Sequence, residues 1–150
     1  LLQLLKQVDI LMVNDSEARE LSGDWNIHRA GRWVLAHGPK LVVIKQGEHG
    51  ALLMDSEGTF AIPGYPLESV FDPTGAGDAF AGGFMGYIAR ARDASDAALR
   101  RAMVYGSVMG SFAVEQFGIR GFENVGDADV EARVDGFRKL TAVHFPGRSA

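Results

Sequence analysis

Residues 71–83 of the sequence read FDPTGAGDAFAGG, a glycine-rich loop that runs into a stretch of small apolar residues. Loops of this kind let backbone N–H groups approach an anion, so the first question is which anion this loop serves. A Walker phosphate loop ends in Gly-Lys-Ser or Gly-Lys-Thr, and the sequence has no such ending here. The loop therefore predicts an anion site of another kind.

A dinucleotide-binding loop of the Rossmann type is a second interpretation, with the pattern G-x-G-x-x-G. Gly75 and Gly77 match its first two glycines, but Phe80 stands at the third position. The third glycine allows a helix to pack closely on a strand, which a phenylalanine would obstruct. Asp78 would also face the pyrophosphate and repel it. An NAD-dependent oxidoreductase stays as an alternative that these residues disfavour.

A phosphoryl-transfer site is the third interpretation, and it gives the aspartate a purpose. Pro73 restricts the loop, while Gly75 and Gly77 let successive N–H groups point the same way at the start of a helix. Such amides stabilise charge on a phosphoryl group in transfer. Asp78 could then accept the proton of an attacking hydroxyl beside them. A purely structural explanation is equally open at this point, because acidic residues are favoured in the first turn of any helix.

The composition excludes several classes of function. The 150 residues carry a net charge of −4 and no cysteine. This balance gives no basic field for nucleic acid or an anionic membrane, and the lack of cysteine excludes disulfides and thiolate zinc sites. The longest apolar stretch, residues 79–89, is too short to span a bilayer, so we expect a cytoplasmic protein. Residues 1–8 resemble the end of a helix and the chain does not begin with Met, which suggests a fragment of a longer protein.

Hydrophobic periodicity predicts strands and helices in alternation through the first part of the chain, and helices after residue 76. This order favours an α/β fold with a largely parallel sheet. The five glycines inside the two long helices suggest close helix packing, and residues 145–150 are expected to be frayed. The predicted strands are residues 10–13, 41–45, 51–55 and 59–63, the last two forming a hairpin, and the predicted helices are 14–23, 27–37, 76–92, 95–117 and 127–140.

Residues 72–84, DPTGAGDAFAGGF, resemble the second signature of the ribokinase-like (PfkB) family of sugar and nucleoside kinases. That signature is close to D-T-x-G-A-G-D, and the sequence differs from it at Pro73. Two further family patterns occur in the expected order, NDSE at residues 14–17 and KQGEHG at residues 45–50. The resemblance covers nearly the whole chain but corresponds to the carboxy-terminal half of a typical member. It implies a three-layer, Rossmann-like ribokinase fold with a mainly parallel sheet, in which residues 1–150 form the nucleotide-binding and catalytic part of one domain. The amino-terminal part, which holds the substrate and a β lid, would be absent.

The resemblance also implies roles for particular residues. Asp78 would be the general base, and the amides of Gly75, Ala76 and Gly77 would form the anion hole. Asn14 and Glu17 would help to place Mg²⁺ through its waters, with Asn14 also close to the nucleotide. The same pair reads as a capping box at a helix start, and both interpretations can hold together.

The remaining roles concern the nucleotide and a monovalent cation. Members of the family bind ATP along the segment that matches residues 45–50, and many need a cation such as K⁺ beside the anion hole. For ATP the resemblance implies Gly47, Gly50, Gly77 and Ser107, and for the cation it implies Asp72, Thr74 and Gly118. Lys45 is placed with the ATP residues, but it stands at a position that varies in the family, so two interpretations stay open: its charge meets phosphate, or it is only solvated.

The sequence as a whole therefore predicts an ATP-dependent kinase that phosphorylates a primary hydroxyl of a sugar or nucleoside. The resemblance leaves the acceptor open and implies that a homodimer is possible in the full-length protein. Besides the NAD-dependent oxidoreductase, a module that binds the nucleotide without transferring phosphate is an alternative.

Overall fold

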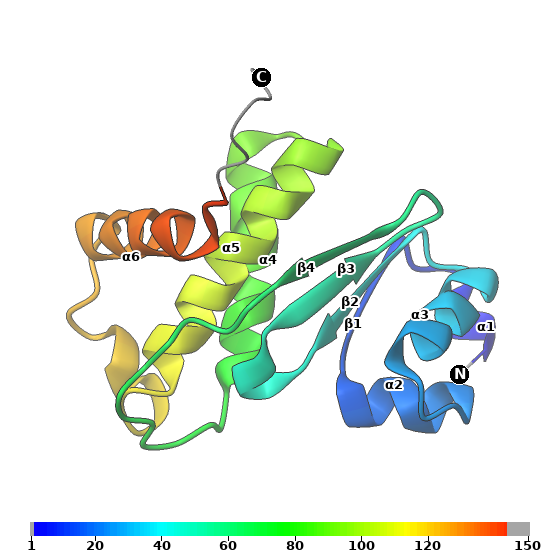
Figure 1. The fold of residues 1–150 in the computed structure, drawn as a ribbon, viewed down its shortest axis with the longest axis horizontal. Coiled ribbons are helices and arrows are strands. Elements are labelled where there is room, and N and C mark those ends of the chain that lie inside the picture. The colour runs from blue at the N-terminus through cyan, green and yellow to red at the C-terminus, as the bar shows by residue number, and fades with distance from the viewer. Residues whose placement is uncertain (1, 144–150) are drawn as a thin grey trace.

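The computed structural model describes residues 2–143 as a sheet covered by helices on both faces (Figure 1). The frayed end expected at residues 145–150 lies outside the described residues. The elements, in chain order, are α1 (Leu2–Leu5), β1 (Ile10–Asn14), α2 (Asp15–Ser22), α3 (Ile27–Ala36), β2 (Leu41–Lys45), η1 (Gly47–His49), β3 (Ala51–Met54), β4 (Thr59–Ile62), α4 (Ala76–Ala91), α5 (Asp96–Ala113), η2 (Gly118–Phe122) and α6 (Asp127–Thr141), where η marks a 3-10 helix.

The sheet has the strand order β1-β2-β3-β4 and is mixed. The pair β1–β2 is parallel, whereas β2–β3 and β3–β4 are antiparallel. The α/β class is therefore confirmed, but within the described residues the sheet is not largely parallel. The physical reason is the length of the connections. A parallel pair needs a crossover such as α2 and α3 provide, and the short turns that follow β2 and β3 allow only antiparallel return.

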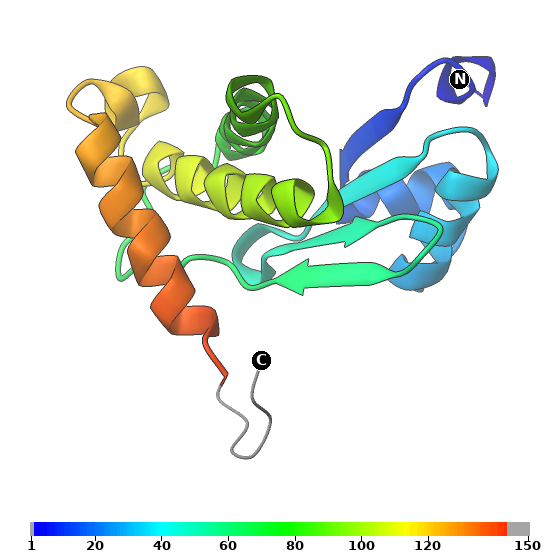
Figure 2. The same cartoon turned by 90° about the horizontal axis from the view of Figure 1, so that it is seen from above.

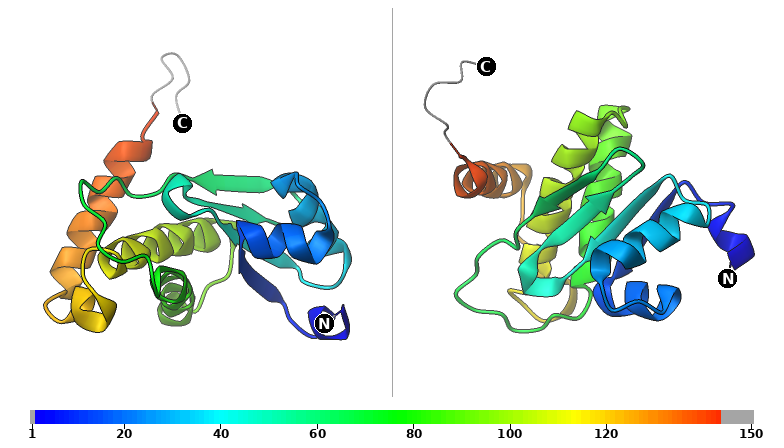
Figure 3. Two further views of the ribbon diagram at one scale, coloured as in Figure 1. Left: turned by 90° about the horizontal axis from the view of Figure 1, so that it is seen from below. Right: turned by 45° about the vertical axis from the view of Figure 1, so that its right-hand side comes forward.

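Strand β2 is the centre of the fold, because residues 41–44 are all buried. Leu41 and Val43 face the layer of α4, α5 and α6, and Val42 and Ile44 face the layer of α2 and α3. A strand covered on both faces reads as a continuous apolar run, which is how LVVI appears in the sequence. Figure 3 shows the two helical layers on opposite faces of the sheet, and Figure 2 shows α6 crossing α5 on the side away from α2 and α3.

Helices α4 and α5 pack closely through three of the five glycines. A methyl group on Gly83 would lie 2.6 Å from the carbonyl oxygen of Tyr105, and one on Gly106 would lie 3.0 Å from the Phe80 ring. Gly110 similarly faces the carbonyl oxygen of Ala76. The packing explanation is confirmed for these three. It is wrong for the other two, since no described atom comes within 4 Å of a methyl group on Gly82 or Gly86.

Neighbouring alanine substitutions in α4 should therefore change stability in opposite directions. We expect Gly83→Ala to lower the free energy of unfolding of the complete protein by about 1–3 kcal/mol, because the methyl group meets a backbone oxygen. Gly82→Ala should raise it by about 0.5–1 kcal/mol, since alanine costs less conformational entropy in a helix. Urea denaturation of both variants would check this, and a Gly83→Ala protein as stable as Gly82→Ala would contradict the packing.

Helix α5 ends at Ala113, earlier than the predicted residue 117. The carbonyl oxygen of Val114 accepts the N–H of Phe71 at 2.8 Å, so the chain leaves the helix where it meets the glycine-rich loop. This contact joins residues far apart in the sequence and fixes the loop at the end of α5.

Candidate active site

The NDSE motif lies at the carboxyl end of β1, where the chain turns into α2. The side-chain Oδ1 of Asn14 accepts the N–H of Glu17 at 2.8 Å, and Oε2 of Glu17 accepts the N–H of Asn14 at 2.7 Å. The capping box predicted from the sequence is thus confirmed. Both side chains are exposed, and Oε1 of Glu17 has no hydrogen-bond partner within residues 2–143.

Lys45 connects this motif to the glycine-rich loop. In the parallel register of β1 and β2, Asn14 is the partner of Lys45, which ends β2. The ammonium group of Lys45 donates to the carbonyl oxygen of Gly77 at 3.3 Å. The end of β2 therefore meets the first turn of α4, and the end of β1 lies beside it in the sheet, at the lower edge in Figure 1.

The glycine-rich loop ends in an open helix terminus. Gly75 is the N-cap of α4 with φ 83°, a left-handed conformation that favours glycine, and no side chain caps the helix. Ala76 donates its N–H to the carbonyl oxygen of Pro73 at 3.2 Å. Within residues 2–143 the N–H groups of Gly75, Gly77 and Asp78 have no acceptor, so they are free to bind an anion. Asp78 is exposed in this first turn.

Phe80 argues against a dinucleotide loop in the structure as in the sequence. Its ring is buried against Gly106 of α5, where a methyl group would lie 3.0 Å from it. The position that a Rossmann loop reserves for a glycine thus holds a core side chain.

The three residues predicted for a monovalent cation belong to two segments that lie side by side. Oδ1 of Asp72 accepts the N–H of Thr74 at 2.9 Å, and this bond holds the pKa of Asp72 below its usual range. The rings of Phe71 and Phe117 are in edge-to-face contact, with centroids 6.5 Å apart. Since Phe71 precedes Asp72 and Phe117 precedes Gly118, this ring contact brings together the two segments that carry the predicted cation residues.

The nucleotide segment forms a tight turn after β2. Gln46 donates its N–H to the carbonyl oxygen of Gly50 at 2.8 Å, and η1 lies between them. Gly47 is exposed with φ 57°, and Gly50 is buried with φ 95°. Ser107 lies in α5 between Gly106 and Gly110, the two glycines of that helix that contact α4.

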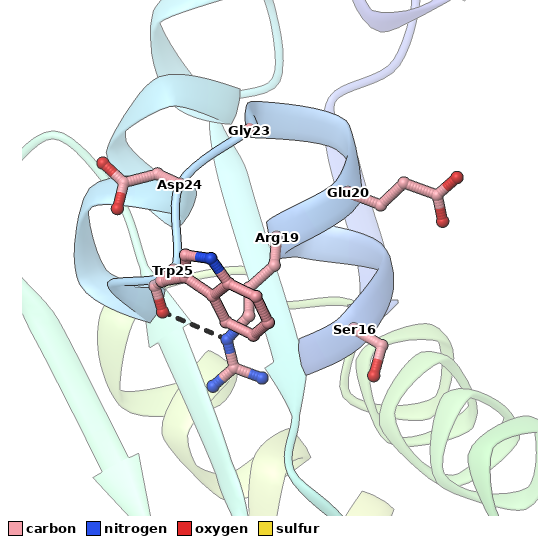
Figure 4. A pocket seen from close by; sticks show the side chains of 6 residues that line it. All are labelled: Ser16, Arg19, Glu20, Gly23, Asp24 and Trp25. Atoms are coloured by element: carbon pink, nitrogen blue, oxygen red, sulfur yellow. Dashed lines mark hydrogen bonds between the residues drawn. The ribbon is translucent and has the colours of Figure 1, made fainter.

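Two surface hollows lie outside the predicted site, and none of the predicted site residues lines either. The first has a volume of about 390 Å³ and lies at the end of α2 (Figure 4). There Arg19 donates from Nε to the carbonyl oxygen of Trp25 at 3.1 Å, beneath an indole that is 87% exposed. The hollow is open, and its Arg19 is already engaged by the Asp15 carboxylate as well as by the carbonyl oxygen of Trp25.

The second hollow, of about 700 Å³, lies between residues 65–71, the end of α5 and α6. Arg133 donates to Oγ of Ser111 and to Oε2 of Glu115, both at 2.8 Å, and lies 3.6 Å over the Phe112 ring. This cluster could not be predicted from the sequence, because Arg133 is in α6 while its partners lie in and just after α5. It holds α6 against the end of α5, next to the segment that carries Asp72.

The described residues contain no group of three His, Cys, Asp or Glu side chains that could hold a metal ion by themselves. In residues 2–143 no helix is long and apolar enough to cross a membrane. A metal at the predicted site would therefore need ligands from a bound substrate or water in addition to Asn14 and Glu17.

The free helix amides and the exposed carboxylate lie on a three-layer α/β fold, and comparison with known proteins defines the family. Residues 1–124 match the model of the pfkB family of carbohydrate kinases, and the chain belongs to that family. It is 41% identical to the cytidine kinase of Thermococcus kodakarensis over 93 residues, which are 60% of this chain and 33% of the relative. It is 36% identical to the aminoimidazole riboside kinase of Salmonella typhimurium over 105 residues, 70% of this chain and 33% of the relative.

Solved structures show the same ribokinase fold. The aminoimidazole riboside kinase of Salmonella enterica, complexed with aminoimidazole riboside and an ATP analogue, has a TM-score of 0.79 at 29% identity over 89% of this chain and 44% of its own. An Escherichia coli protein assigned as ribokinase II, complexed with ATP and Mg²⁺, has a TM-score of 0.74 at 29% identity over 90% of this chain and 42% of its own. A fructokinase double mutant of Vibrio cholerae, with fructose, ADP and potassium bound, has a TM-score of 0.79 at 25% identity over 88% of this chain and 42% of its own.

The chain thus spans a third of the length of the curated relatives and less than half of the matched structures. More than half of each neighbour's fold therefore has no counterpart here.

Proposed function

We propose that the protein containing this chain transfers the γ-phosphate of ATP to a primary hydroxyl of a sugar or nucleoside, with Asp78 as general base. The observation that carries the proposal is the exposed Asp78 carboxylate in the first helical turn beside the free N–H groups of Gly75 and Gly77. The membership of the family and the acceptors named for its relatives, which are nucleosides and sugars, support the class of substrate. Residues 1–150 would supply the nucleotide side of one domain, and the acceptor would be held by residues outside this chain.

In the proposed reaction Asp78 accepts the hydroxyl proton of the acceptor, and the oxygen attacks the γ-phosphorus in line. The new P–O bond forms as the bond to the β-phosphate oxygen breaks, and ADP leaves with that electron pair. The free amides of Gly75 and Gly77 would stabilise charge on the transferring group, and the Ala76 N–H would join them once it releases Pro73. Gly47, Gly50 and Ser107 would bind the nucleotide, and Lys45 would reach its phosphates.

A divalent and a monovalent cation fit this site. Asn14 and Glu17 would hold Mg²⁺ through water, since Oε1 of Glu17 remains free when the capping box is formed. Mg²⁺ would supply charge neutralisation at the phosphates. Asp72, Thr74 and Gly118 would hold K⁺, a proposal supported by the contact between their two segments.

Two variants of Glu17 distinguish a role in Mg²⁺ binding from a role in capping helix α2. Glu17→Gln should keep the capping box, because glutamine also accepts the N–H of Asn14, and the melting temperature should stay unchanged. The missing charge should raise the Mg²⁺ concentration needed for half-maximal turnover by about 10–100-fold. Glu17→Ala should lose both stability and Mg²⁺ affinity. A Glu17→Gln protein with normal Mg²⁺ dependence would show that Glu17 is only a cap.

The function itself is tested by an acceptor screen of the complete protein. ADP release from Mg-ATP is measured with a panel of sugars and nucleosides, and the phosphorylated product is identified by mass spectrometry. Transfer to one class of alcohol supports the proposal. ATP binding without transfer to any alcohol would favour a nucleotide-binding module, and stabilisation by NAD alone would favour the oxidoreductase.

A further inference from the structure

Lys45 occupies a position that its own fold does not explain. It is half-buried at the end of β2, and its ammonium group reaches the carbonyl oxygen of Gly77 at 3.3 Å. Among residues 2–143 this is the one hydrogen bond recorded for the ammonium, which has three N–H donors, and Lys45 forms no ion pair there. Lys40, just before the other end of the same strand, is by contrast exposed and paired with Asp9 at 2.8 Å.

The electrostatics of the position are unfavourable without an anion. Gly77 is in the first turn of α4, where the helix dipole is positive, and a cation near that end destabilises a helix. The ammonium thus adds positive charge to a place that already has free N–H groups. A local arrangement that costs stability is typical of a functional site, and here the missing compensation is negative charge.

The chain also makes room for this ammonium. A methyl group on Gly77 would lie 2.8 Å from the Nζ atom of Lys45, closer than a real Cβ allows. Gly77 is also one of the residues whose free N–H groups would stabilise the transferring phosphoryl group, so the ammonium lies at the part of the proposed site where negative charge would develop.

We propose that Lys45 is a catalytic residue that contacts the transferring phosphoryl group and balances its charge, an inference that rests on the proposed kinase function. As the acceptor oxygen loses its proton to Asp78 and bonds to phosphorus, negative charge grows on the phosphoryl oxygens and on the β-phosphate oxygen that leaves. The ammonium group of Lys45 neutralises this charge and keeps all its protons. The bond to the Gly77 carbonyl holds it in place before the nucleotide binds.

The test measures kcat and the KM for Mg-ATP in the complete protein carrying Lys45→Met, Lys45→Gln or Lys45→Arg, with Lys40→Met as the matched control. Lys45→Met should lower kcat by about 10²-fold with little change in KM, as for loss of a group that acts in the transition state. Lys45→Gln keeps an N–H donor for the Gly77 carbonyl but loses the positive charge. Its kcat should fall as far as that of Lys45→Met, because the proposed role depends on charge. Lys45→Arg should recover part of the loss, and Lys40→Met should match the unchanged protein.

Three results would overturn the inference. A higher KM with normal kcat would make Lys45 a ground-state nucleotide ligand. Normal kinetics in Lys45→Gln alone would assign the role to the bond with Gly77, and normal kinetics in all variants would leave Lys45 without a role. Asp78→Asn measured in parallel separates this inference from the function: if that variant is inactive while Lys45→Met turns over normally, the kinase function stands and only the role of Lys45 fails.

Discussion

Replacing Asp78 by asparagine should lower kcat of the complete protein by about 10³–10⁴-fold, the upper range for loss of a general base. Asparagine has nearly the same shape but does not accept the proton of the attacking hydroxyl. Because the side chain is exposed and forms no hydrogen bond with another side chain within residues 2–143, the fold should not change. Affinity for Mg-ATP, measured by calorimetry, should remain within a few-fold of the unchanged protein, since the free amides remain in place.

The matched control for this variant is Asp127→Asn. Asp127 is also an exposed aspartate in the first turn of a helix, in this case α6, and it lies outside the predicted site. Both variants lose the same favourable interaction with a helix dipole, so both should show a small and similar loss of stability. Only Asp78→Asn should lose turnover. If both variants turn over normally, Asp78 is an ordinary first-turn aspartate and the general base is elsewhere.

The elements at the site could be predicted from the sequence because their signals are local. Asn14 and Glu17 are three residues apart, and a capping box depends on nothing more distant than that spacing. Gly75 and Gly77 likewise mark the start of α4 through local sequence alone. The class of fold followed from the alternation of strands and helices, which the structure confirms.

What the sequence could not supply are contacts between distant segments. Lys45 and Gly77 are 32 residues apart, and nothing in either neighbourhood indicates that an ammonium should meet that carbonyl. The early end of α5 depends on the bond from Phe71 to Val114, which replaces a turn of predicted helix. The antiparallel pair β3–β4 is the hairpin predicted from the sequence, but the antiparallel pairing of β2 with β3 was missed. Periodicity shows that a strand exists and not which way its neighbour runs, although the short turn after β2 held that information.

The family resemblance implies that residue 50 is a glycine because it binds ATP, whereas the structure gives a reason within the fold. Its φ of 95° and ψ of −140° belong to a region open essentially to glycine alone. A methyl group there would lie 2.0 Å from the carbonyl oxygen of Ile62 and 2.5 Å from the carbonyl carbon of Pro63. The turn after β2 is therefore held against the end of β4 by a backbone contact that no side chain fits.

Gly50→Ala should for this reason be among the most destabilising single substitutions in the chain. Backbone strain and overpacking together should lower the free energy of unfolding of the complete protein by about 4 kcal/mol. Gly47→Ala is the control in the same turn, because Gly47 is exposed with φ 57° and no described atom lies within 4 Å of a methyl group there. It should cost about 1–2 kcal/mol, the strain of a left-handed residue.

Denaturant unfolding with and without Mg-ATP distinguishes the two reasons for these glycines. If Gly47 allows the nucleotide to approach, Gly47→Ala should lose most of the stabilisation that Mg-ATP gives, although the protein without nucleotide remains folded. Gly50→Ala should be unstable already without nucleotide, because the clash is with β4 and not with ATP. Equal stability of the two variants would mean that the turn relaxes away from Ile62, and the demand for glycine at residue 50 would then come from the nucleotide after all.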